Sequence, residues 1–207
     1  ATYNLDGLHL GFDNFVFTQN TLAIIISNNK ISESDGNSGN KRFMLQLQPA
    51  SGKLRCYPGD RDIIVSDALK ADALAKGPFS LKFTKGTDGY TVSINGASGL
   101  IANDIINASA IDAAKIYPTF SGWDGATLSF DLTSIHDSTK TCKEITSSID
   151  SRFYAPSVSL GTTTDYWGNR FTVADLENNG GIHYNITGGV PEVRSGLTPT
   201  FGLDGLH

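Results

Sequence analysis

Hydrophobic and polar residues alternate with a period of two along much of the chain, which is the pattern of half-buried β-strands. In the segment 79–84, Phe and Leu alternate with Ser and Lys, and in 89–94 Tyr, Val and Ile alternate with Thr and Ser. A turn containing Gly and Asp joins the two segments, and an Asn-Gly pair follows the second. Because alternate side chains of a strand point to opposite faces, we expect an antiparallel sheet with one buried and one solvated face.

The same pattern predicts many short strands and only one helix. Strands are expected at residues 8–11, 14–18, 21–27, 42–48, 53–57, 62–66, 79–84, 89–94, 116–121, 126–135, 151–160, 169–174 and 182–187. The helix is expected at 66–76, with Ser66 as its N-cap and Gly77-Pro78 as its stop. So many short strands predict an all-β fold, an antiparallel β-sandwich of the jelly-roll, concanavalin-like type, with a few extra strands at the C-terminus.

Length and composition favour a single domain over residues 1–207, and they argue against several partners. The 22 Gly and the single Met favour turns and strands over long helices. A net charge of −5 with scattered Lys and Arg argues against nucleic acid, because phosphate binding relies on clustered cations. No apolar run approaches the roughly 20 residues of a membrane helix, so we expect no membrane insertion.

Several features fit a secreted protein, located outside the cell or at its surface. Glycosylation is predicted at Asn107 and Asn185, which begin Asn-x-Ser/Thr sequons, and Ala1 is interpreted as a processed N-terminus. Cys56 and Cys142 are expected to form a disulfide, which would contribute about 4 to 5 kcal/mol in the chain-entropy model. The alternative is two buried thiols. The four His residues show no zinc-ligand spacing, so neither a metal nor a cofactor is expected.

Three stretches resemble the strand succession of galectin-type and concanavalin-like lectin sandwiches. They are RFMLQLQPASGKLRCYPGD, PFSLKFTKGTDGYTVSINGASGLI and IYPTFSGWDGATLSFDLTSI, which together span residues 42–135. The resemblance implies a lectin-like core there, with residues 143–207 as an extension packed on it. Galectins bind galactose through a His-x-Asn-x-Arg strand and a Trp-x-x-Glu loop. Because the corresponding segment 54–61 lacks this motif, no site residue is taken from the resemblance.

A sugar site instead needs an aromatic ring beside Asp, Asn or Arg groups, because a pyranose has an apolar face and a fringe of hydroxyls. The best candidate for such a site comprises Asp165, Tyr166, Trp167, Asn169 and Arg170, and the second comprises Trp123 and Asp124. The alternative for the first is that Trp167 packs under its loop while Arg170 pairs with Asp165. The alternative for the second is that Trp123 caps one end of the sandwich.

These observations favour carbohydrate binding or adhesion, with glycans or a cell-surface polysaccharide as partners. The second hypothesis is a structural cell-wall or matrix protein that self-assembles. The third is an extracellular polysaccharide lyase or glycosidase. Glycosidases need two carboxylates about 5 to 10 Å apart, and none of the four Glu lies in a suitable strand pattern. We therefore expect binding rather than catalysis.

The sequence LDGLH occurs twice, at residues 5–9 and 203–207. The repeat extends outward to Thr2 and Thr200 and to the aromatic residues Tyr3 and Phe201. It indicates a tandem array, two equivalent strands in one sandwich, or a pairing between molecules. The sequence leaves these three open, and a homo-oligomer or an array would give multivalent binding.

Overall fold

The computed structural model describes residues 2–28, 41–122, 125–139, 171–172, 182–187 and 190–195. The strands in these ranges are β1 (His9–Gln19), β2 (Leu22–Ser27), β3 (Arg42–Gln48), β4 (Lys53–Tyr57), β5 (Arg61–Val65), β6 (Phe79–Lys85), β7 (Gly89–Ile94), β8 (Ala97–Ala102), β9 (Tyr117–Gly122), β10 (Thr127–His136), β11 (Phe171–Thr172), β12 (Ile182–Thr187) and β13 (Val190–Ser195). The helices are the 3₁₀ turn η1 (Asp67–Leu69), α1 (Ala71–Leu74) and α2 (Asn103–Ser109). Within these ranges no helix has the length and apolarity needed to cross a membrane.

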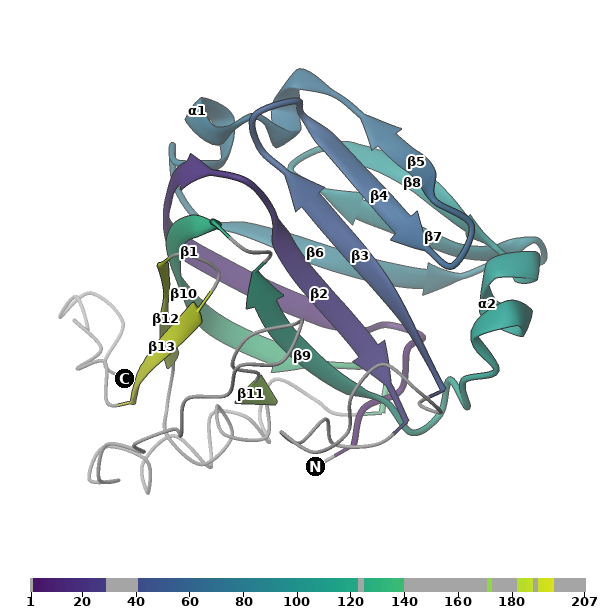
Figure 1. Ribbon diagram of the computed structural model, residues 1–207. Coiled ribbons are helices and arrows are strands. Elements are labelled where there is room, and N and C mark those ends of the chain that lie inside the picture. The colour runs from purple at the N-terminus through teal and green to yellow at the C-terminus, as the bar shows by residue number, and fades with distance from the viewer. Residues whose placement is uncertain are drawn as a thin grey trace, which may run out of the picture.

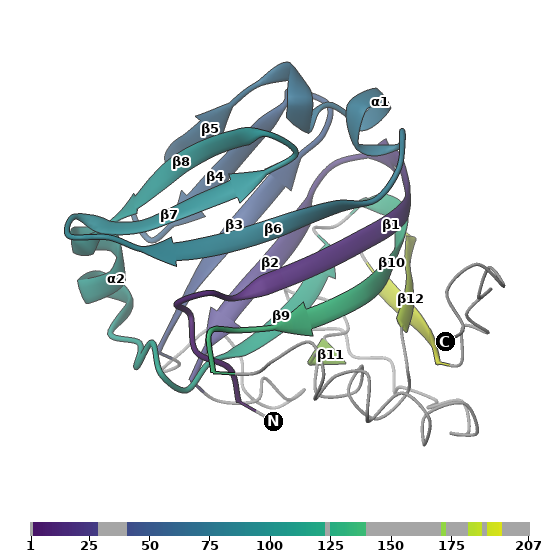
Figure 2. The same ribbon diagram turned by 180° about the vertical axis from the view of Figure 1, so that it is seen from behind.

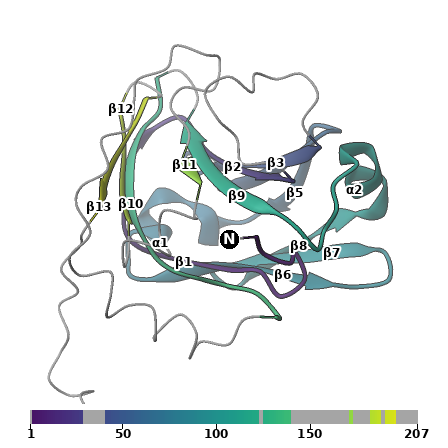
Figure 3. The same cartoon turned by 90° about the horizontal axis from the view of Figure 1, so that it is seen from below.

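Two antiparallel sheets pack face to face (Figure 1). Over the described residues, one sheet has seven strands in the order β13-β12-β10-β1-β6-β7-β8, and the other has six in the order β11-β9-β2-β3-β4-β5. Figure 2 shows the seven-stranded sheet in front, and Figure 3 shows the two layers from below with the N-terminal segment between them. The structure confirms the predicted all-β sandwich, whereas the jelly-roll type stays a prediction.

The main core lies between the sheets and contains the inward-facing residues of the strands, while β2 is buried on both faces, because Ala23 and Ile25 on its other face pack with Met44. Leu22, Ile24 and Ile26 of β2 are all at most 1% exposed. Phe12 on β1 contacts Phe120 on β9 edge to face, with ring centroids 5.8 Å apart, and so links the two sheets. Aromatic pairs of this kind contribute about 0.5 to 1.5 kcal/mol beyond the area they bury. The alternation read from the sequence therefore assigns the core correctly.

The hairpins also follow from local sequence. β6 pairs with β7 across the turn that contains Gly86 and Asp88, as predicted. Asn95 and Gly96 have φ angles of 48° and 83° and form the two-residue connection from β7 to β8. Positive φ at both central positions is the requirement of the type I′ turn, which Asn-Gly satisfies at low cost.

Two expectations differ from the structure in detail, three elements were not expected, and one expected strand is not tested. The strands expected at 8–11 and 14–18 are one strand, β1, whose pairing shifts near Asn14, a residue with a φ of 49°. The expected helix is divided into η1 and α1, although the Ser66 side chain does accept a hydrogen bond from the Ala68 amide as an N-cap should. The elements β8, α2 and β13 were not predicted. The strand expected at 151–160 lies outside the described residues.

The expected disulfide between Cys56 and Cys142 is not found. Cys56 is a free thiol with no exposed surface, and Cys142 lies outside the described residues. The reason is the alternation of β4: Cys56 shares the inward face with Leu54, and its thiol packs in the core as a small apolar group. This burial raises the pKa of the Cys56 thiol to about 12.

Candidate functional site

Every residue predicted to bind a ligand lies outside the described residues. This applies to Asp165, Tyr166, Trp167, Asn169 and Arg170, and equally to Trp123 and Asp124. The two sugar sites predicted from the sequence therefore stay predictions. The described residues contain a different candidate, on the outer face of the seven-stranded sheet.

This candidate is built on three neighbouring strands, β6, β1 and β10. Gly11 in β1 lies opposite Ser80 on one side and Ser134 on the other. Two residues earlier along β1, His9 lies opposite Lys82 and His136. Because residues two apart in a strand share a face, the side chains of these two rows lie on the same outer surface.

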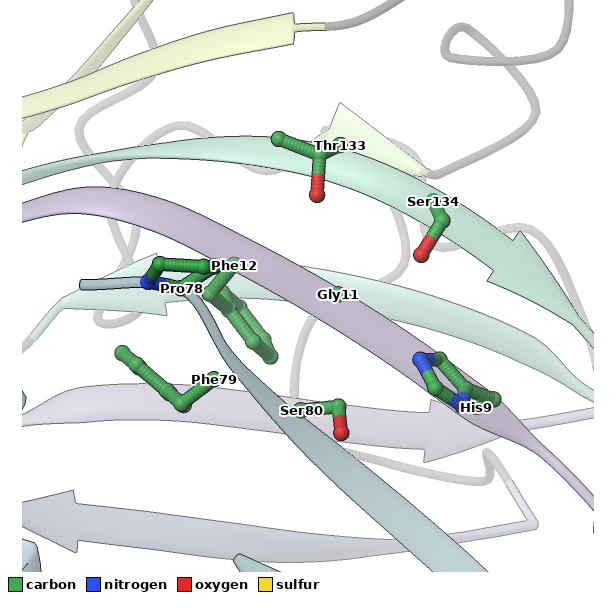
Figure 4. Close-up of a pocket in the computed structure, with 8 residues that line it drawn as sticks. All are labelled: His9, Gly11, Phe12, Pro78, Phe79, Ser80, Thr133 and Ser134. Carbon is green, nitrogen blue, oxygen red and sulfur yellow. The ribbon is translucent and has the colours of Figure 1, made fainter. Parts of the chain in front are cut away.

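Gly11 leaves a hollow in its row because it has no side chain. A Cβ atom at this position would lie only 2.3 Å from the Ser134 Oγ, so the absence of a side chain at Gly11 lets the Ser134 hydroxyl reach the floor of the hollow. The resulting cavity has a volume of about 260 Å³. Its lining residues, shown in Figure 4, are His9, Gly11, Phe12, Pro78, Phe79, Ser80, Thr133 and Ser134. We call it the Gly11 pocket.

A β-bulge brings a second hydroxyl into the pocket. Gly11 pairs with Ser134 and Phe12 with Leu132, so Thr133 is an extra residue without a partner in β1. A bulge of this kind redirects side chains locally. Figure 4 shows the hydroxyls of Thr133 and Ser134 both directed toward Gly11, although consecutive residues of a regular strand would point to opposite faces.

The opposite wall of the pocket is less polar. Phe12 and Phe79 are buried beneath it and stack on each other with ring centroids 5.1 Å apart. Pro78 is exposed at the rim, just before β6 begins. The pocket therefore has hydroxyls along the β10 side, the Ser80 hydroxyl on β6, and an apolar edge at Pro78.

The histidines beside the pocket are uncharged near neutral pH. His9 and His136 stack with ring centroids 4.3 Å apart. Burial, followed by the nearby His136 and Lys82, lowers the pKa of His9 to about 4, and burial also lowers the pKa of His136. A neutral imidazole has one donor and one acceptor nitrogen. His9 therefore adds a neutral hydrogen-bonding group to the wall.

Two carboxylates lie on the other side of Gly11 along the strands. Asp13 follows Gly11 by two residues and lies opposite Asp131 on β10. The Asn14 side chain donates a hydrogen bond of 2.7 Å to Asp131, which is 8% exposed. Since two residues of a strand span about 7 Å, these acidic groups lie roughly one sugar ring away from the centre of the pocket.

The polar groups that line the pocket are hydroxyls and a neutral imidazole, which can donate and accept hydrogen bonds. Among the described residues, no hydrogen bond joins Ser80 or Ser134 to an imidazole. The same part of the chain contains no cluster of three or more His, Cys, Asp or Glu that could hold a metal ion. What remains is a set of neutral donors and acceptors around a small hollow.

A charged cluster on the edge of the other sheet is the second surface with dense polar groups. Arg55 donates to Asp62 at 2.7 Å and to Asp60 at 3.0 Å, and Lys53 also pairs with Asp62. The Arg55 and Lys53 cations lower the pKa of Asp62 by hydrogen bonding to its carboxylate. Because the cations and carboxylates of this cluster pair with one another, it has fewer groups available for hydrogen bonds to a ligand than the Gly11 pocket has.

The predicted glycosylation sites lie apart from the pocket. Asn107 is exposed on α2, whereas the hydroxyl of Ser109 in the same sequon donates to the Ile106 carbonyl at 2.6 Å. Asn185 lies in β12, in register with Ser129 of β10. Modification at either residue stays a prediction.

Sequence reasoning did not find the Gly11 pocket, although a faint signal was present. The signal is Gly11 itself, which stands between His9 and Asp13 in the row of alternate positions that is otherwise polar. A Gly inside a strand often marks a bulge or a close approach of other groups. Ser80 lies 69 positions after Gly11 in the chain and Ser134 lies 123 positions after it. Only the register of the sheet brings the three residues together.

Comparison with known protein families, with curated proteins and with solved structures finds no match to this chain. The resemblance to galectin-type sandwiches thus rests on the strand succession that the sequence shows.

Proposed function

We propose that this protein is an extracellular carbohydrate-binding module and that one sugar residue occupies the Gly11 pocket. The observation that carries the proposal is the hollow over Gly11, which Ser80, Thr133 and Ser134 surround with hydroxyls. Hydroxyl groups donate and accept hydrogen bonds, and so do the hydroxyls of a sugar. The residues that line the pocket are uncharged near neutral pH, which suits an uncharged polyol.

The size of the pocket supports a small ligand. Its volume of about 260 Å³ falls just below the roughly 300 to 1,000 Å³ of pockets that take drug-sized ligands. A single monosaccharide ring suits this space. Asp13, which is partly exposed, is then placed to accept a hydrogen bond from a second sugar residue further along the sheet. Binding through a shallow pocket of this kind is weak per site, so linked copies would be needed for high avidity.

The first experiment is a glycan-array screen of the labelled protein, with and without calcium, followed by a titration of the best glycan. The test variant combines Gly11→Ala with Ser134→Ala. The first change fills the hollow, and the second removes the Oγ that the new Cβ would strike at 2.3 Å. We expect affinity to fall at least tenfold, which corresponds to about 1.4 kcal/mol.

The matched control is Thr91→Ala, which removes a hydroxyl from the same sheet on strand β7, away from the pocket. It should leave affinity unchanged. Trp167→Ala tests the site predicted from the sequence. Loss of binding in the Trp167 variant but not in the Gly11 and Ser134 variant would move the site to the predicted loop and refute the pocket assignment. A blank array with folded protein would refute the carbohydrate proposal and favour the self-assembling matrix protein.

The facing pair Asp13 and Asp131 supports a second candidate function, a glycosidase. Residues directly opposite on neighbouring strands have Cβ atoms about 4.5 to 5.5 Å apart, so the two carboxylates lie near each other, and a glycosidase uses such a pair of neighbouring carboxyl groups. Incubating the best array ligand with the protein tests this candidate. Turnover with a bell-shaped pH profile that Asp131→Asn abolishes would establish an enzyme, and an intact glycan would leave binding alone.

A further inference from the structure

A row of outward-facing residues crosses five strands of the seven-stranded sheet, directly beside the Gly11 pocket. In the order β10, β1, β6, β7 and β8, the register places these residues opposite one another: His136, His9, Lys82, Ser93 and Ser98. We call this set the basic row. His9 also lines the Gly11 pocket (Figure 4), so the basic row and the pocket form one continuous surface.

The side chains of the basic row point away from the core. The residues on both sides of Lys82, Leu81 and Phe83, are at most 1% exposed, whereas Lys82 itself is exposed. Because residues directly opposite on neighbouring strands share a face, Lys82 lies on the same surface as the His9 imidazole. Every side chain of the row can donate a hydrogen bond, and none is a carboxylate.

Lys82 brings a positive charge to this surface. Within the part of the chain that the structure describes, Lys82 takes part in no salt bridge. Its charge acts on both imidazoles, because it is one cause of the lowered pKa values of His9 and His136. Asp137 acts on His136 in the opposite sense, but its carboxylate is 4% exposed and accepts hydrogen bonds from two backbone amides. The exposed charge of the row is therefore positive.

Carboxylates of the same surface lie on the far side of the pocket. Asp13 follows His9 by four residues of β1, which corresponds to about 13 Å along a strand, and Gly11 lies between them. Across the pocket the surface changes from positive at Lys82 to negative at Asp13. A ligand with one negative charge is attracted at the basic row and repelled at Asp13, so these charges also set its orientation.

An anion suits the basic row better than a metal ion does. Neutral imidazoles are common metal ligands, but the Lys82 ammonium repels a cation. The rings of His9 and His136 are also stacked with their planes 24° apart, so their in-plane lone pairs run side by side instead of converging on one point. A carboxylate or a sulfate ester instead gains the charge of Lys82 and the hydrogen-bond donors around it.

We propose that the basic row is an anion subsite of the Gly11 pocket and that the ligand is an acidic sugar, whose ring occupies the pocket while its carboxylate or sulfate ester lies over Lys82 and His9. This inference rests on the proposed function, because it places a sugar ring in the pocket. It adds the class of the sugar and the direction in which it lies. Lys82 follows Ser80 of the pocket wall by two residues, or about 7 Å of strand, which its four-carbon stem can span.

The first test uses inorganic sulfate, which requires no knowledge of the sugar. The imidazole resonances of His9 and His136 are followed by NMR while sodium sulfate is added to the full chain at constant ionic strength. We expect saturable shifts at both imidazoles and a rise in the pKa of His9, because a bound anion offsets the charge of Lys82. Lys82→Gln should abolish these shifts, and Lys82→Arg should retain them.

The matched control is Lys85→Gln, which removes the same charge three residues further along β6. This variant should leave the sulfate shifts unchanged. It controls for the change in net charge, which is equal in Lys82→Gln and Lys85→Gln.

The second test compares acidic sugars with their neutral parents at low salt, using the same resonances. The pairs are glucuronate with glucose and galacturonate with galactose, and glucose 6-sulfate distinguishes a sulfate ester from a carboxylate. An acidic sugar should bind at least about threefold more tightly than its parent, which lies within the range of an exposed charge pair. Lys82→Gln should remove this preference, and Lys85→Gln should keep it. The affinity for the acidic sugar should rise about twofold from pH 7 to pH 4.5, because the bound anion favours protonation of His9.

The outcomes separate this inference from the proposed function. Neutral sugars that bind as tightly as their acidic counterparts would overturn the anion subsite and leave the carbohydrate proposal in place. Sulfate shifts that are absent, or equal in the wild type and Lys82→Gln, would also overturn the anion subsite. If sulfate shifts the His9 resonance and no sugar does, the proposed function fails and the acidic-sugar ligand fails with it.

Discussion

Gly99 lies where the two sheets come into backbone contact at one edge of the sandwich. It belongs to β8, the last strand of the seven-stranded sheet, and faces β5, the last strand of the other sheet (Figure 1). A Cβ at Gly99 would lie 1.9 Å from the Ile63 carbonyl oxygen and 2.7 Å from its carbon. Ile63 is the extra residue of a bulge in β5, which pushes its carbonyl toward β8. Gly99→Ala must therefore separate two backbones.

The magnitude follows from that distance. Real Cβ contacts lie beyond about 3 Å, so the edge strands must move apart by about 1 Å, and a gap of that size forfeits a quarter to a half of each van der Waals contact. Overpacking costs about 1 to 3 kcal/mol, and a contact with backbone on both sides belongs at the upper end. The Tm should fall by about 6 to 12 °C at 2 to 4 °C per kcal/mol.

Thermal unfolding followed by circular dichroism measures this effect, and Gly86→Ala is the matched control. A Cβ at Gly86 would meet its nearest atom, the Gly89 carbonyl oxygen, at an ordinary 3.6 Å. Gly86→Ala should change the free energy of unfolding by less than about 1 kcal/mol. The change should be stabilising if it acts mainly by reducing the conformational entropy of the unfolded chain. Equal Tm values for the two variants would show that the edge contact between the sheets is not as close as the structure places it.

Two further predictions concern titratable groups. In the absence of reductant, Cys56 in the native Cys142→Ser variant should not react with a thiol reagent at pH 8, because burial holds the pKa of Cys56 at about 12. When the wild-type protein is denatured without reductant, the reagent should titrate two free thiols, whereas a protein with a Cys56–Cys142 disulfide would give none. The lowered pKa of His9 means that the unfolded state binds more protons than the folded state between about pH 4 and 6.5, so stability should fall as the pH drops through this window. In Tm measurements from pH 4.5 to 7.5, His9→Gln should flatten that dependence, and an unchanged slope would contradict the assignment to His9.

The fold was largely readable from the sequence because its signals are local. The alternation in 42–48, 53–57 and 89–94 gave strand bounds that agree with the structure residue for residue. β8 was missed because its sequence, ASGLIA, combines small residues with an internal Gly, and its place in the sheet is fixed by pairing with β7. The helix α2 was missed because Ala102, at its N-cap, makes no side-chain cap that would signal a helix start.

The candidate site was not readable from the sequence because it depends on register between distant strands. Gly11, Ser80 and Ser134 become neighbours only when β1 pairs with both β6 and β10, and a shift of one residue would turn each of them into the core. The bulge at Thr133 is likewise a property of the pairing. Sequence reasoning looked instead for aromatic residues beside polar ones within a single loop. That criterion selects sites built from consecutive residues and passes over those assembled across a sheet.

His9 links the Gly11 pocket to the N-terminal segment, residues 2–9. Its neighbours Gly7 and Leu8 are held by backbone hydrogen bonds with Phe83, while its imidazole stacks on His136 at the wall of the pocket. The packing of the N-terminal segment between the sheets therefore positions one side of the proposed sugar site.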